Sequence, residues 1–300
     1  MDKKQDLNNI VIIIIFFLFG NYSIIAQNNP QMDEYRKKQM NEYRKEAKRG
    51  STLCMINYAN NLEYNKNAMD SVEANKWYHK AEHKLLKRIE KDNEDFGGWT
   101  SWELGEIYYC LKEFPTALHW LQISSSKGNG NASWYLGKMY RDGIGCEVNY
   151  KKSVDWFEKA TGQGHMYAEL ELAILYYEEK YSVQDYALAK RHFDKLTNHS
   201  HDNIKTIAKA YLGMICYKQP CYIISNGKIQ TRDYKNAFKY LIEASKNKFY
   251  FPASAMRVLS ACYRYGLGTD IDNEKAEYWL KESANHDDDV AARILNKEVR

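Results

Sequence analysis

Two histidines and a glutamate lie close enough in the sequence to suggest zinc chemistry. His79, Glu82 and His83 spell H-x-x-E-H, in which two histidines one helical turn apart would hold the metal and the glutamate would act as base. The same residues overlap the segment Trp77–Ala81, which belongs to a pattern that recurs along the chain, and the sequence offers no third ligand. We interpret the match as coincidence, and predict no catalytic residue, no metal and no cofactor. A zinc-dependent hydrolase that uses these three residues is the alternative.

The helices that would position any site belong to a repeat. In each unit a leucine is followed by a small residue and, usually, by an aromatic residue four positions after the leucine; the leucines are Leu104, Leu136, Leu172, Leu212 and Leu259, and Leu295 begins an incomplete unit. A second small residue, mostly with an aromatic residue three positions later, recurs at Ala74, Ala117, Ser153, Ala189, Ala237 and Ala276. Self-similarity at intervals of roughly 30 to 50 residues predicts stacked helix pairs. Neither helix of a pair can bury its apolar stripe alone, so the units must stack.

Glycines recur directly after the leucines, as Gly105, Gly137 and Gly213. Glycine inside a helix costs about 1 kcal/mol relative to alanine, so its recurrence indicates a structural need. We predict that the missing side chain lets the two helices of a unit approach closely.

The third and sixth units carry the most specific pattern. The third has Leu136-Gly137, Tyr140, Gly143-Ile144-Gly145, Trp156 and Lys159-Ala160, and the sixth repeats it from Leu259 to Trp279. This pattern resembles the Sel-one-like repeat (SLR) family, a relative of the tetratricopeptide repeat, over about residues 98–300. The resemblance implies an all-α fold, a right-handed α-solenoid of stacked antiparallel helix pairs with five to six units and a C-terminal half-unit. It also implies an adaptor protein.

The chain divides into three segments. Residues 1–26 are typical of a secretory signal peptide, with Lys3 and Lys4 before an apolar run, and cleavage is expected between Ala26 and Gln27. An uncleaved membrane anchor is the alternative; the apolar run is short for a spanning helix. Residues 27–50 form a charged lead-in that is mobile or helical. Residues 51–300 form the solenoid, with a degenerate first unit, an insertion at 218–232 and a cap at 288–298. We therefore expect a periplasmic or extracellular protein.

The charge distribution argues against nucleic acid as a partner. The net charge is +4, and residues 31–50 contain seven Lys/Arg and four Asp/Glu, so most of the excess lies outside the repeats. The repeats are close to neutral and offer no basic face to the phosphate backbone. We also expect no stable membrane span once the signal peptide is removed.

The six cysteines form no CxxC pair and no metal-ligand set. Cys110 and Cys146 follow the first helices of neighbouring units. A disulfide between them is one alternative, and two free thiols are the other.

One column of residues lies five positions after the repeat leucines: Tyr109, Arg141, Tyr177, Tyr217 and Arg264. These positions are turned about 100° from the buried aromatic residue that precedes them. By analogy with tetratricopeptide arrays, that side of the first helix lines a concave groove. Tyr and Arg are enriched in interface hot spots, so the column is our candidate for binding a protein or peptide partner of unknown identity. The alternative is that these side chains pack on neighbouring units.

The sequence therefore predicts an exported, non-catalytic helical-repeat adaptor or scaffold that binds through its concave face. A carbohydrate- or cell-wall-binding module is the other non-catalytic possibility, because exposed Tyr and Trp side chains also stack on sugars.

Overall fold

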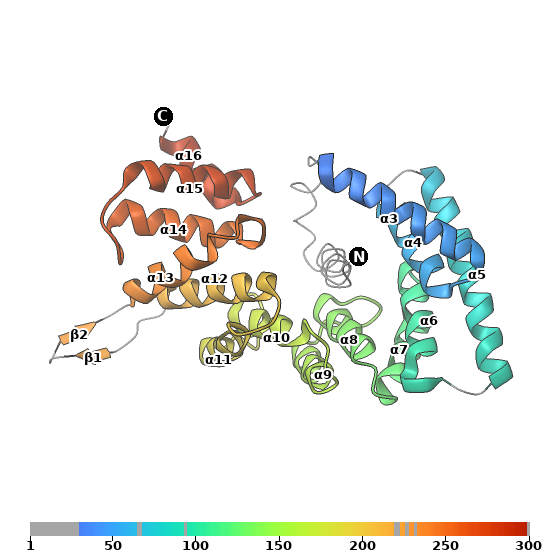
Figure 1. The fold of residues 1–300 in the computed structure, drawn as a ribbon. Helices are drawn as coiled ribbons and strands as arrows, with labels where there is room; N and C mark the ends of the chain where they lie inside the picture. Colours follow the sequence, from blue (N-terminus) through green and yellow to red (C-terminus); the bar gives the residue numbers. More distant parts are fainter. Residues whose placement is uncertain are drawn as a thin grey trace. The chain divides into compact units, whose positions relative to one another are not determined.

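The computed structural model describes residues 30–64, 68–92, 95–218, 223–225, 228–230 and 233–298, and most of them lie in helices (Figure 1). The α-helices are α3 (Pro30–Arg49), α4 (Thr52–Tyr64), α5 (Ala68–Asp92), α6 (Trp99–Cys110), α7 (Phe114–Ser126), α8 (Gly130–Asp142), α9 (Tyr150–Gly162), α10 (Ala168–Tyr177), α11 (Tyr186–Leu196), α12 (Asp202–Lys218), α13 (Tyr234–Ala244), α14 (Ala253–Tyr265), α15 (Asn273–Asn285) and α16 (Asp289–Glu298). Two short 3-10 segments, η1 (Phe96–Gly98) and η2 (Lys248–Tyr250), precede α6 and α14. None of the described helices has a stretch that is both long and apolar enough to cross a membrane.

The α8/α9 pair shows how the repeat residues build a unit. Leu136 of α8 is fully buried, as predicted. A Cβ atom added to Gly137 would lie 2.6 Å from the ring of Phe157, so the glycine is what lets α9 approach α8. The Ser153 hydroxyl donates a hydrogen bond to the Gly137 carbonyl oxygen at 2.8 Å, across the same contact. Gly105 and Gly213 meet leucine side chains of their partner helices in the same way. The prediction of close helix approach at these glycines is therefore confirmed.

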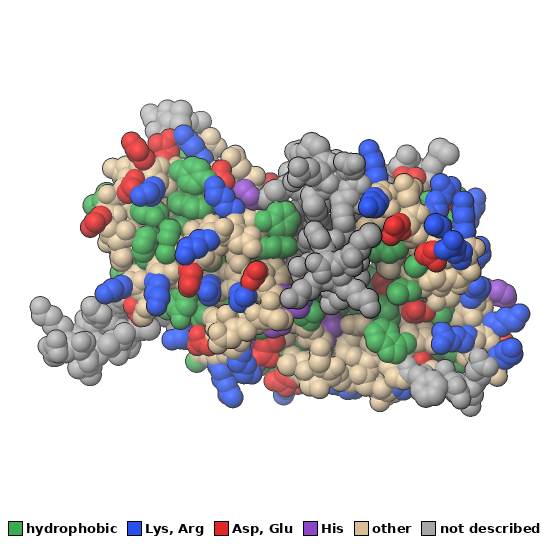
Figure 2. Space-filling view, in the orientation of Figure 1, with side chains coloured by type: hydrophobic (Ala, Val, Ile, Leu, Met, Phe, Trp, Pro, Cys, Tyr) green, Lys and Arg blue, Asp and Glu red, His purple; other side chains and the backbone are tan. Residues whose placement is uncertain are grey.

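The helices form two compact units, which we describe separately. Residues 34–189 contain the pairs α4/α5, α6/α7 and α8/α9, followed by α10 and the start of α11. Residues 190–300 contain the rest of α11, the pairs α12/α13 and α14/α15, and the single helix α16. Acidic and basic side chains are interspersed on the visible face of each unit (Figure 2).

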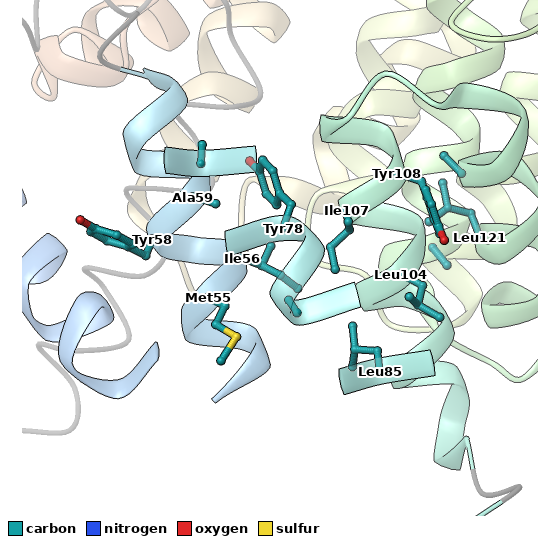
Figure 3. Close-up of a cluster of buried hydrophobic side chains, with 14 of the residues drawn as sticks. Met55, Ile56, Tyr58, Ala59, Tyr78, Leu85, Leu104, Ile107, Tyr108 and Leu121 are labelled. Carbon is teal, nitrogen blue, oxygen red and sulfur yellow. The ribbon is translucent and has the colours of Figure 1, made fainter. Parts of the chain in front are cut away.

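The core of the 34–189 unit runs continuously through its helix pairs. Met55 and Ile56 of α4, Tyr78 and Leu85 of α5, Leu104 and Ile107 of α6 and Leu121 of α7 are all fully buried (Figure 3). Side chains of each pair thus pack against those of the next pair. Because a helix pair buries its apolar side chains only against its neighbours, the pairs of a repeat protein must stack.

The first unit is a complete helix pair. The sequence predicted a degenerate first unit, and in the structure α4 packs along α5 as the first helices of later units pack on their partners. Residues 30–49 of the charged lead-in form α3, and Ala47 of that helix belongs to the buried core, with Met40 and Tyr43 packed against it. Helix α3 therefore covers the apolar end of the first pair. The predicted signal peptide and its cleavage site at Ala26 and Gln27 lie outside the described residues.

The C-terminal segment forms the expected additional half-unit. Asp288 caps α16 by accepting hydrogen bonds from the backbone N–H groups of Val290 and Ala291, and it accepts a third from Arg257 Nε of α14 at 2.8 Å. Ala291 is fully buried.

Within the predicted insertion at 218–232, the structure describes two short antiparallel strands, β1 (Ile223–Ser225) and β2 (Lys228–Gln230). They are a local departure from an otherwise helical fold.

Candidate binding site

The three residues of the H-x-x-E-H sequence lie on α5, where His79 and Glu82 contact each other. His79 Nδ1 lies 2.9 Å from Glu82 Oε2, and the Tyr108 hydroxyl donates to Glu82 Oε1 at 2.6 Å. Burial alone would raise the pKa of Glu82, but the hydrogen bonds from Tyr108 and His79 outweigh burial and lower the pKa. A lowered pKa makes a carboxylate a weaker general base. Among the described residues, no three His, Cys, Asp or Glu side chains are placed to hold a metal ion.

The cysteines that the structure describes, Cys54, Cys110, Cys146, Cys216 and Cys262, are free thiols. The sequence left open whether Cys110 and Cys146 form a disulfide or stay reduced, and in the structure both are free thiols. Cys110 Sγ lies 3.4 Å from Asn60 Oδ1, and Cys146 Sγ lies 3.5 Å from the Met139 carbonyl oxygen. Burial raises the pKa of Cys110 far above its ordinary value, which keeps this thiol protonated and unreactive.

In the 34–189 unit, the predicted Tyr/Arg column is partly packed. The Tyr109 ring is half-buried between the rings of Phe114 and Tyr135, with centroids 5.8 Å and 5.4 Å away. The Arg141 side chain is 15% exposed, and its guanidinium donates to Glu171 Oε2 of α10 at 2.6 Å. Both side chains thus join neighbouring helix pairs while keeping part of their surface exposed.

The prediction that Tyr177 lines a groove is wrong. It is only 5% exposed, with its ring 5.7 Å from that of Tyr186, so it belongs to the core rather than to a groove surface. Helix α10 ends at Tyr177, where the chain turns towards α11 and covers the ring. In the 190–300 unit, Tyr217 of α12 and Arg264 of α14 are half-buried, and the Tyr217 ring contacts that of Tyr234.

A buried polar cluster lies between the first two helix pairs. Asn60 Nδ2 donates to Glu106 Oε1 at 3.2 Å, and the Tyr78 hydroxyl donates to Asn60 Oδ1 at 2.5 Å. Burial raises the pKa of Glu106 to about 7. Nothing in the repeat pattern marks Glu106, which lies two positions after Leu104, as a buried residue.

The structure also contains a pocket that the sequence did not predict. Its volume is about 320 Å³, and it is lined by Gly97 and Trp99, by residues 127–131 between α7 and α8, and by residues 163–165 between α9 and α10. All of these residues belong to turns or helix starts within the 34–189 unit. The alternating Gly and Asn residues at 128–131 are the only sequence signal that could have drawn attention to it.

Comparison with known proteins identifies the repeat. The family model of the Sel1 repeat matches residues 67–83, 102–129, 130–165, 167–201, 207–249 and 253–288. A protein of Neisseria meningitidis serogroup B, uncharacterized protein NMB1327, is 28% identical over 179 residues, which are 59% of this chain and 34% of that protein. The chain thus spans about a third of the length of this relative.

Two solved structures share the fold. One is c5321, a protective antigen of uropathogenic Escherichia coli with an SLR fold (TM-score 0.54, 19% identity, covering 84% of this chain and 50% of that one). The other is a Sel1 repeat protein from Oxalobacter formigenes (TM-score 0.54, 24% identity, covering 76% of this chain and 88% of that one). The expected fold class is confirmed.

Proposed function

The chain belongs to the Sel1 repeat family, and we propose that it is an exported, non-catalytic scaffold that binds a protein or peptide through the first helices of its repeats. The first-helix face of the 34–189 unit is defined by the partly exposed side chains of Tyr109 and Arg141, and that of the 190–300 unit by Tyr217 and Arg264. The repeats of this family are helical scaffolds for protein interaction, which supports the general function.

The observation that carries the proposal is the partial exposure of Tyr and Arg on the first helices of four pairs. Tyr109 of α6, Arg141 of α8, Tyr217 of α12 and Arg264 of α14 occupy the same repeat position, and each is neither fully buried nor fully exposed. Side chains held by their neighbours lose little conformational entropy on binding, which lowers the cost of association. Tyr and Arg are also among the residue types enriched in interface hot spots.

The contacts of Arg141 decide how the face should be tested. Its partner Glu171 is 8% exposed in its side chain, so Arg141→Ala would leave a buried carboxylate without its counter-ion. Breaking such a pair costs about 3–5 kcal/mol, and lost binding would then be hard to separate from lost stability. Substituting Tyr217 and Arg264 in the other unit tests binding without removing the counter-ion of Glu171.

The proposed function is tested first by finding a partner. The chain from Gln27 onward would be immobilised and exposed to the envelope and secreted fractions of its native cells, and retained proteins would be identified by mass spectrometry. We expect at least one protein to be retained specifically and to bind again as a purified component. Failure of every retained protein to bind the purified chain would contradict the scaffold function.

Export is tested separately. Protein isolated from native cells would be subjected to N-terminal sequencing, and a chain that begins near Gln27 is expected if the signal peptide is cleaved. A chain that retains Met1 and fractionates with the membrane would instead support the anchored alternative. A chain that retains Met1 in the soluble cytoplasmic fraction would contradict export.

A further inference from the structure

The pocket between the turns of the 34–189 unit is shaped by glycine. A Cβ atom added to Gly130, the first residue of α8, would lie 3.2 Å from both the Gln163 carbonyl oxygen and His165 Cβ. Glycine therefore lets residues 163–165 approach the start of α8 and form one wall of the pocket. Gln163 holds that wall in place, because its Nε2 donates to the Ser125 carbonyl oxygen at 3.0 Å.

Asn129 contributes a buried donor that has no partner in the part of the chain that the structure describes. Its Oδ1 caps α8 by accepting from the backbone N–H groups of Asn131 and Ala132 at 3.0 Å and 3.3 Å, which fixes the orientation of the amide. The amide nitrogen Nδ2 is then left without a partner among the described residues, although Asn129 is only 5% exposed. An unpaired buried donor costs about 1–3 kcal/mol, so a ligand that accepts from Nδ2 would recover part of that cost.

His165 adds a second unpaired group to the lining. Its ring stacks on that of Trp134, with centroids 5.0 Å apart and planes 20° apart, and its Nδ1 is buried without a partner among the described residues. Burial, and secondarily the charge of Lys138, lowers the pKa of His165 to about 4. The ring is therefore neutral at ordinary pH and offers one donor and one acceptor.

The rim provides an aromatic surface and no unbalanced charge. Trp99 is 57% exposed, so most of its indole is available for stacking. Lys127, the one charged side chain among the described lining residues, is paired with Asp95 at 3.1 Å. Among the described residues that line the pocket, none is Ala, Val, Leu, Ile or Met.

We propose that this pocket binds a neutral oligosaccharide. Sugar hydroxyls donate and accept, which matches the Asn129 amide and the neutral His165 ring, and the apolar face of a sugar ring can stack on Trp99. An anion fits less well, because Lys127 is neutralised and Asn129 already caps two N–H groups of α8. A peptide fits less well because the lining offers no apolar recess for its side chains. Oligosaccharide binding goes beyond the protein-binding function proposed above and does not depend on it.

Binding would be measured by calorimetry and by 15N NMR of the Trp99 indole signal. The probes are maltotriose, cellotriose and triacetylchitotriose, with inorganic phosphate and a capped neutral Ser/Gly pentapeptide as competing ligand classes. We expect at least one trisaccharide to bind with a Kd on the order of 1 mM or below and to shift the Trp99 signal.

Two substitutions test whether the oligosaccharide binds in this pocket. Trp99→Ala removes an exposed ring, and Asn129→Ser removes Nδ2 while keeping a side chain that caps α8 well. Each should weaken trisaccharide binding at least about threefold. The matched controls are Tyr265→Ala, which removes another exposed aromatic ring, and Asn149→Ser, which alters the N-cap of α9; both should bind as the wild type does. Circular dichroism of each variant monitors folding, and because Trp99 is exposed, Trp99→Ala keeps the test valid if Asn129→Ser unfolds.

Three outcomes would overturn the proposal: no trisaccharide binds, binding is unchanged in folded Trp99→Ala, or only phosphate or the pentapeptide shifts the Trp99 signal. The first would mean that the unpaired groups of Asn129 and His165 do not form a sugar-binding site.

Discussion

Replacing Glu106 with glutamine should stabilise the protein at pH 8 but have much less effect at pH 4.5. Glu106 lies on α6 and is 7% exposed, and its Oε1 accepts a hydrogen bond from Asn60 Nδ2. Glutamine has nearly the same shape, and its side-chain oxygen can accept the same hydrogen bond. The substitution therefore removes the charge and leaves the packing in place.

The size of the expected change in stability follows from the pKa of Glu106 in the folded chain. Burial raises the pKa of Glu106 from its ordinary 4.5 to about 7. Below pH 4.5 the carboxyl is protonated in both the folded and unfolded chains, and its titration does not affect stability. Between pH 4.5 and 7 the unfolded chain loses the proton while the folded chain keeps it, so the free energy of unfolding falls as the pH rises. One pKa unit corresponds to about 1.4 kcal/mol, which gives a destabilisation of at most about 3 kcal/mol above pH 7.

The assay is urea unfolding of wild type and Glu106→Gln at pH 4.5, 6 and 8, at constant ionic strength. The informative quantity is how the stability difference between the two proteins changes with pH, because the glutamine NH₂ group can add a constant cost of its own. We expect this difference to shift in favour of the variant by about 2–3 kcal/mol from pH 4.5 to pH 8. Glu90→Gln, which removes an exposed carboxylate from α5, controls for the change in net charge. A stability difference that does not vary with pH would refute the reasoning.

Three further predictions concern the fold and the absence of a metal. Gly137→Ala should cost about 1–3 kcal/mol in urea unfolding because its Cβ would meet Phe157. Gly162→Ala, where a Cβ has open space, should be neutral or stabilising by up to about 1 kcal/mol, and an equal loss at both sites would contradict the packing account. Deleting residues 287–300 should lower the Tm and solubility by uncovering the last helix pair, and unchanged melting would refute the capping role of α16. Metal analysis should find no zinc; one zinc per chain, lost in His79→Ala, would reopen the hydrolase alternative.

The repeat pattern predicted the contacts inside each helix pair. Leucine and glycine at fixed positions determine which side of the first helix meets the second, and Leu136, Gly137 and Phe157 lie as that periodicity requires. Such contacts are local in sequence, so they can be deduced from one unit at a time.

Contacts between pairs were harder to deduce. Tyr177 and Tyr109 occupy the same repeat position, yet the start of α11 covers Tyr177 while Tyr109 stays half-exposed, because the connecting turns differ in length. The burial of Ala47 in α3 was missed because the helix is otherwise strongly charged. The pocket was missed for a related reason: its lining comes from three turns that periodicity does not describe.

The most direct test of the proposed function is a titration of the captured partner with two matched double variants. Tyr217→Ser with Arg264→Ser alters the first-helix face of the 190–300 unit. Tyr278→Ser with Lys281→Ser makes comparable changes on α15, a second helix, where both side chains are exposed. We predict that the first variant binds at least about tenfold more weakly than the wild type, or 1.4 kcal/mol, and that the second binds normally, with helicity unchanged in both. Normal binding by the folded first variant, with a loss in the second, would contradict the assignment of the binding face.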